Sequence, residues 1–140
     1  MRRDLTVGET AHVDQVVALI RDVEREWPYN EALIADSECE RVVLERLGDT
    51  WEGMRADRCY LLWGHGRMVE LPLANSMVIT ATALNTAPTG GECDRCRCVT
   101  TLAGVAVVAV PRNLVPLVLC WACVEELNPE SLLQTGASHA

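Results

Sequence analysis

Two pairs of cysteines are the residues of this chain whose type and spacing could do chemistry. Two residues separate Cys93 from Cys96 and Cys120 from Cys123, and 23 residues lie between the pairs. A C-x2-C segment curls so that both sulfurs face one point, and two such segments can form a closed tetrahedral thiolate site. Soft sulfur ligands in this geometry select zinc or iron, which the spacing alone does not separate. We predict one structural zinc ion at these four residues, with no open position for catalysis.

Three further cysteines lack this pairing. Cys39 and Cys59 stand alone in the sequence, so we expect them to be ordinary core or surface thiols. Cys98 closely follows the first pair and could replace one of its ligands. No apolar stretch typical of a secretory signal follows Met1. We therefore expect a cytoplasmic protein whose cysteines are reduced or metal-bound rather than joined in disulfides.

The segment from Cys93 to about Asn128 resembles the treble-clef and zinc-ribbon group of four-cysteine zinc modules. It contains C-D-R-C, two apolar runs and then C-W-A-C-V-E-E-L. The treble-clef resemblance implies a first cysteine pair on a knuckle, a hairpin, and a second pair that opens a helix. The sequence departs from the usual knuckle at Arg97 and Cys98, where such modules often carry glycine directly after the second cysteine.

Two helices are predicted before residue 50. Apolar residues recur at spacings of three and four within residues 10–27. This stripe consists of Val13, Val16, Val17, Ile20, Val23 and Trp27. A second helix is predicted from about Ser37 to Leu47, because Ser37 and Glu40 have the spacing of a capping box. Residues 30–35 could begin this helix a turn or more earlier.

Short strands are predicted in the middle of the chain. Residues 59–73 contain two apolar runs around G-H-G, which is typical of a hairpin, and a helix over residues 50–63 is the alternative. Residues 77–84 are rich in Val, Ile and Thr, which predicts another strand. Residues 85–91 read N-T-A-P-T-G-G, which predicts a turn-forming link.

The last third of the chain is expected to form a hairpin and a short helix. Residues 99–110 and 114–119 are apolar runs on either side of a turn at Pro111–Asn113. Arg112 lies near the middle of the apolar stretch from 102 to 124, which argues against a membrane span. Residues 120–127 predict the helix.

These elements predict an α+β protein with a helical N-terminal part, short strands and a C-terminal four-cysteine zinc module. We predict an acidic α+β core over residues 1–86, the zinc module over 87–130 and a tail over 131–140. The module's hairpin is too apolar to be solvated on both faces. It should cover the N-terminal core, a second subunit or a partner protein, so we expect a homodimer or a protein partner.

Charge and composition exclude several classes of function. The formal net charge is -8, and all twelve basic residues are Arg. Without Lys, the chain cannot act through a Schiff-base lysine or a P-loop. Nucleic acid is disfavoured by the acidic charge and would need Arg95, Arg97 and Arg112 to converge on one face. The lack of Lys and Phe beside abundant Arg, Ala, Val and Gly indicates a G- and C-rich genome, such as that of an actinobacterium or its phage.

No catalytic motif accompanies the cysteines. The zinc-deaminase pattern H-x-E with P-C-x-x-C is absent, as are G-x-S-x-G and H-E-x-x-H. His65 is expected to be a turn residue and Trp121 a packing residue. We therefore favour a non-catalytic protein that acts in protein interaction or regulation. The alternatives are a nucleic-acid-associated zinc module and a thioredoxin-like redox protein using Cys120 and Cys123.

Overall fold

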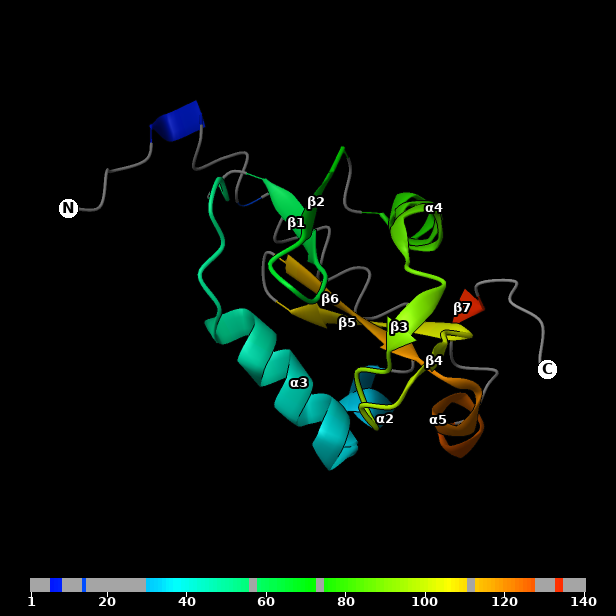
Figure 1. Ribbon diagram of the computed structural model, residues 1–140. Coiled ribbons are helices and arrows are strands. Elements are labelled where there is room, and N and C mark those ends of the chain that lie inside the picture. The colour runs from blue at the N-terminus through cyan, green and yellow to red at the C-terminus, as the bar shows by residue number, and fades with distance from the viewer. Residues whose placement is uncertain are drawn as a thin grey trace.

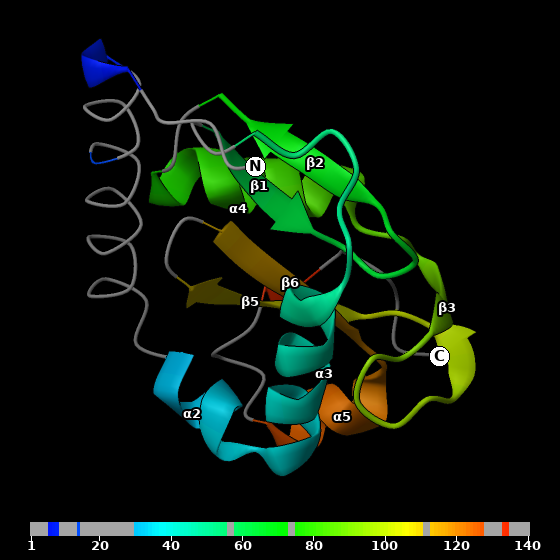
Figure 2. The same cartoon turned by 90° about the vertical axis from the view of Figure 1, so that its left-hand side faces the viewer.

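A five-stranded sheet with helices on both of its faces forms the centre of the molecule, as Figures 1 and 2 show for the computed structural model. The structure describes residues 6–8, 14, 30–55, 58–72, 75–110, 113–127 and 133–134. The strand order is β2-β1-β6-β5-β7, and β3 and β4 form a separate two-stranded sheet. The strands are β1 Cys59–Leu62, β2 Met68–Leu71, β3 Gly90–Glu92, β4 Val99–Thr101, β5 Gly104–Val110, β6 Asn113–Leu119 and β7 Leu133–Gln134. The helices in these ranges are α2 Asn30–Ala35, α3 Ser37–Gly48, α4 Ser76–Thr86 and α5 Trp121–Glu126. The predicted α+β class is confirmed.

The predicted C-terminal hairpin forms the centre of this sheet. β5 and β6 pair antiparallel along their whole length, and nearly all of their residues are buried. α2 and α3 cover one face of the sheet, and α4 lies against the other (Figures 1 and 2). Both faces of the apolar runs are therefore covered within the chain, which removes the reason to expect a partner there. A homodimer or protein partner stays a prediction.

Strands from both sides of the predicted domain boundary share this sheet. β1 pairs with β6 in parallel through Tyr60–Asn113 and Leu61–Leu114. β7, in the predicted tail, pairs with β5 at Gly104 and Val105. The division into a core over 1–86 and a module over 87–130 stays a prediction. Within the described ranges, no helix has the length and apolar character needed to cross a membrane.

The helix predicted from about Ser37 is confirmed as α3, but its predicted cap is wrong. The side chain of Asp36, rather than Ser37, accepts a hydrogen bond from the backbone N–H of Cys39 at 3.0 Å. Asp36 has an extended backbone, so α2 is a separate helix and not an extension of α3. The buried face of α3 consists of Cys39, Val42, Val43 and Arg46. The helix predicted over residues 10–27 lies outside the described residues, apart from the helical Asp14.

The strand predicted over residues 77–84 is wrong, because this segment forms helix α4. Asn75 caps the helix by accepting a hydrogen bond from the N–H of Val78 at 2.9 Å. Ile79 and Ala83 lie one turn apart and are both 0% exposed. This burial outweighs the β-propensity of the Val, Ile and Thr residues, which is a weak and context-dependent preference. α4 and β3 also take up parts of the predicted link over 85–91.

The hairpin predicted over residues 59–73 is confirmed, and the alternative helix over 50–63 is wrong. β1 and β2 pair antiparallel, and the N–H of Arg67 donates to the carbonyl of Gly64 at 3.3 Å. His65 and Gly66, the two central residues of this turn, have φ angles of 60° and 74°. Left-handed backbone at both positions is the type I′ geometry that suits the twist of a tight hairpin.

The edge of β6 that faces away from β5 is completed by side chains as well as by β1. Alternate residues of a strand direct their backbone polar groups to the same edge, and on this edge they are Leu114, Pro116 and Val118. Leu114 pairs with β1. Pro116 has no N–H, and its carbonyl accepts a hydrogen bond from the guanidinium of Arg46. Both backbone groups of Val118 are hydrogen-bonded to Asp94. The Val118 N–H donates to the Asp94 carboxylate at 2.8 Å, and the Asp94 N–H donates to the Val118 carbonyl at 2.8 Å.

Arg46 and Asp94 also contact each other. Arg46 Nη2 lies 3.1 Å from Asp94 Oδ1, and their side chains are only 6% and 14% exposed. Such a pair is costly to break, because removal of one partner leaves the other charge buried without compensation. The pair therefore joins α3, β6 and the first cysteine pair into one unit.

We expect the substitution Arg46→Ala to lower the free energy of unfolding by about 3 kcal/mol, because Asp94 and the Pro116 carbonyl would both lose their partner. The measurement is the midpoint of urea unfolding. Arg41→Ala is the matched control, since Arg41 lies on the exposed side of α3 and pairs with Glu38 and Glu45. Exposed pairs of this kind contribute about 0.5 kcal/mol. Equal losses in the two variants would contradict the role given to Arg46.

Candidate metal centre

The four cysteines singled out in the sequence lie together. Their Sγ atoms are all within 4.8 Å of one another. Cys93 Sγ lies 3.7 Å from Cys123 Sγ, and Cys96 Sγ lies 3.7 Å from Cys120 Sγ. Zinc–sulfur bonds of about 2.3 Å require tetrahedral edges of about 3.8 Å. The cluster could therefore hold one metal ion among four thiolates.

The first pair is held by the turn that joins β3 to β4. The N–H of Cys93 donates to the carbonyl of Cys98 at 2.9 Å, and the N–H of Arg97 donates to the carbonyl of Cys93 at 2.9 Å. Arg97 has a φ of 68°, which is the left-handed region that glycine usually occupies. Arg97 occupies the position where such knuckles usually carry glycine, and its backbone adopts the conformation that a glycine would have there.

The second pair is held by the start of α5. Cys120 is the N-cap residue and Cys123 lies in the first turn, so both sulfurs lie at the same end of the helix. The N–H of Ala103 donates to the carbonyl of Leu119 at 2.8 Å at the base of the β5–β6 hairpin, which brings Cys120 next to the knuckle. The backbone N–H of Cys120 then donates to Cys93 Sγ at 3.4 Å.

Charged side chains fasten the knuckle to the helices around it. Arg95 contacts Asp36, the cap of α3, at 3.1 Å and also binds Glu126 of α5. The hydrogen bond from Arg95 is the main reason why the pKa of Asp36 is lowered. Arg97 lies 3.4 Å from both Glu45 and Glu92. The knuckle arginines are therefore matched by carboxylates of the same chain. Arg112, the third residue of the nucleic-acid alternative, lies outside the described residues.

The four thiols differ in exposure and acidity. Burial is the main reason why the pKa values of Cys93 and Cys123 are raised. Cys96 is the exposed member of the cluster, and its pKa is lowered to about 7, chiefly by a hydrogen bond from the backbone of Cys98. Cys120 is buried. A metal bound here would replace protons on buried sulfurs, so binding would release protons and weaken in acid.

The remaining cysteines lie outside this group of four. Cys39 and Cys59 are buried at 0% and 3% exposure, and burial raises the pKa of each to about 12. Of the core or surface positions expected for them from the sequence, both occupy the core. Cys98 is exposed, and its hydrogen bond with Cys96 raises its pKa. Cys98 and Cys96 are thus both exposed thiols of the knuckle.

Other residues considered in the sequence do not join the cluster. His65 is exposed in the β1–β2 turn, where a turn residue was expected. Trp121 is half-buried and packs against the core, as expected. Asp36, Arg46 and Asp94 could not be recognised from local sequence patterns, because their contacts join distant segments. One local signal was available: Pro116 within an apolar strand indicates an edge that needs no N–H donor there.

Comparisons of the chain with protein-family models, with curated proteins and with solved structures find no match.

The left-handed backbone of Arg97 gives a test of the knuckle geometry. We expect Arg97→Gly to retain bound metal and to be as stable as the parent or more stable by up to about 1 kcal/mol, because glycine adopts this conformation without the cost of a side chain. Arg97→Val should be less stable than Arg97→Gly by about 2 kcal/mol, because a β-branched residue is strongly disfavoured there. Both variants lose the exposed pairs with Glu45 and Glu92, so each controls for the other. Equal melting temperatures would show that residue 97 is not left-handed.

Proposed function

We propose that this chain is a small intracellular zinc-binding protein in which Cys93, Cys96, Cys120 and Cys123 hold one structural zinc ion. The observation that carries the proposal is the approach of all four sulfurs to within 4.8 Å. The order of elements supports the treble-clef resemblance: a cysteine turn between two strands is followed by a hairpin and then by a helix that begins at the second cysteine pair.

The character of the ligand set favours a structural ion. Four thiolates fill the coordination shell of zinc and leave no position for water or substrate. Cys93, Cys120 and Cys123 are buried, so the ion would be largely shielded from solvent. The side chain of Arg95 hydrogen-bonds Cys123, which offsets part of the negative charge that four thiolates bring to one divalent ion.

A role in protein interaction or regulation fits this site better than the alternatives. A redox dithiol at Cys120 and Cys123 would need an accessible, acidic thiol, whereas both residues are buried and burial raises the pKa of Cys123. Nucleic-acid binding needs free cationic side chains, whereas Arg95 and Arg97 are paired with carboxylates and the chain carries a net charge of -8.

Elemental analysis of the purified protein tests the proposal most directly. We expect one zinc per chain and a colourless protein. Cys93→Ser and Cys120→Ser should bind metal substoichiometrically, whereas the matched controls Cys39→Ser and Cys59→Ser should stay fully loaded because those thiols lie outside the cluster. Cys98→Ser should also retain zinc. A coloured protein that contains iron would show that the bound metal is iron and not zinc. A metal-free protein with a Cys120–Cys123 disulfide that cycles with reductant would favour the redox alternative.

Metal removal should disturb more than the knuckle. Binding and folding of a metal site are linked, so a strong chelator should loosen the β3–β4 turn and the start of α5. Because Asp94 and Arg95 contact Arg46 and Asp36, we also expect faster hydrogen exchange at the N-terminal turn of α3. The β1–β2 pairing and the middle of α4 serve as internal controls. Unchanged exchange throughout after metal removal would contradict a structural role for the ion.

A further inference from the structure

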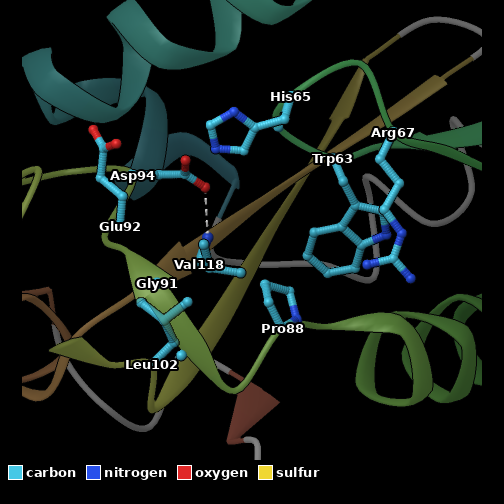
Figure 3. A pocket seen from close by; sticks show the side chains of 11 residues that line it. Trp63, His65, Arg67, Pro88, Gly91, Glu92, Asp94, Leu102 and Val118 are labelled. Carbon is cyan, nitrogen blue, oxygen red and sulfur yellow. Dashed lines mark hydrogen bonds between the residues drawn. The ribbon is translucent and has the colours of Figure 1, made fainter. Parts of the chain in front are cut away.

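A cavity of about 230 Å³ lies beside the cysteine turn, and it is lined by Glu92 and Asp94 but by no cysteine. Its walls come from the β1–β2 turn, from β3 with the residues before it, and from β6 (Figure 3). We propose that this cavity binds a carboxylate carried on a small apolar body, with an aromatic ring as the best fit, through Trp63 and Arg67. The proposal goes beyond the metal centre and does not depend on it.

The inner part of the cavity is apolar and its walls are buried. Trp63 and Leu102 are 3% and 1% exposed, and Val118 is 6% exposed. The indole N–H of Trp63 donates to Thr86 Oγ1 at 3.2 Å, so the polar atom of this ring is satisfied by the protein. The rest of the ring can offer carbon surface to a ligand. Burial of apolar ligand surface against such walls is favourable.

The unmatched charge at the cavity is positive. Two carboxylates line it, but Asp94 is paired with Arg46 at 3.1 Å and Glu92 with Arg97 at 3.4 Å. Arg67 also lines the cavity, is exposed, and its guanidinium has no ion pair or hydrogen bond with the described residues.

Figure 3 shows the side chains of Trp63 and Arg67 on one side of the cavity and those of Glu92 and Leu102 on the other. A ligand whose ring lies on the Trp63 side can therefore place a carboxylate at Arg67, whose planar fork of N–H donors matches a carboxylate in two hydrogen bonds. His65 lies at the same turn and offers a further ring N–H.

The volume limits the size of the ligand. An apolar protein cavity of about 150 Å³ holds one benzene molecule. The present cavity therefore has room for one six-membered ring and a short chain that ends in a carboxylate. The same chemistry occurs in a free aromatic acid and in the C-terminal aromatic residue of a peptide, and the choice of probes separates these two sources.

The test is a titration of the purified 140-residue chain, followed by calorimetry and by NMR. Phenylacetate represents a free acid, N-acetylphenylalanine represents a peptide C-terminus, and phenylacetamide is the uncharged counterpart of phenylacetate. We expect at least one acid to bind with shifts at the Trp63 indole N–H, Gly90 and Gly91, and phenylacetamide to bind at least about 10-fold more weakly because it lacks the charge. If phenylacetate binds more tightly, the ligand class is a free aromatic acid. If N-acetylphenylalanine binds more tightly, the ligand class is a peptide with an aromatic C-terminal residue.

Arg67→Gln should weaken binding of the acid at least about 10-fold without a change in melting temperature, because Arg67 is exposed and has no ion pair among the described residues. Arg41→Gln is the control, since it removes a charge of the same sign from α3, away from the cavity, and should bind as the parent does. The proposal is overturned if neither acid binds at millimolar concentration, if acid and amide bind equally, or if Arg67→Gln binds like the parent. Shifts that map outside the cavity would overturn it as well.

Discussion

The contact between Arg46 and Asp94 at the open edge of β6 is the interaction on which the rest of the structure depends. β6 lies in the middle of the main sheet, yet β1 covers only the beginning of its second edge. From Pro116 onward, Arg46 and Asp94 supply the hydrogen bonds that a neighbouring strand would make. Because Arg46 belongs to α3 and Asp94 lies between two proposed ligands, one contact fixes the position of the helix, the sheet and the cysteine turn together.

The cysteine centre and the core are consequently parts of the same packing arrangement. Arg95 joins the cap of α3 to α5, and Arg97 reaches α3 and β3. In an acidic chain that has no lysine, these arginines serve as internal connectors between segments. Arginine suits this task, since its planar group can bind two acceptors at once. The two carboxylates at the cavity near the β1–β2 turn are paired with other arginines. Arg67 therefore has no carboxylate partner among the described residues.

The parts of this architecture that local patterns encode could be predicted from the sequence. The cysteine spacing predicted which sulfurs meet, and the apolar runs around residues 111–113 predicted the β5–β6 hairpin and the helix after it. α4 could not be predicted from its composition, because Asn75 and the burial of Ile79 and Ala83 decide its form against the preference of its Val, Ile and Thr residues. The roles of Arg46 and Asp36 could not be predicted either, since each depends on contacts with residues many positions away in the chain.

The proline in β6 has a consequence for how molecules of this protein meet one another. A bare strand edge is a template on which a strand of another molecule can add, and such addition starts aggregation. At Pro116 no N–H is available, and at Val118 both backbone groups are already occupied by Asp94. This apolar strand therefore presents no free row of backbone donors and acceptors on this side. The residues that hold the cysteine turn in place thus also keep the core of the sheet from recruiting a foreign strand.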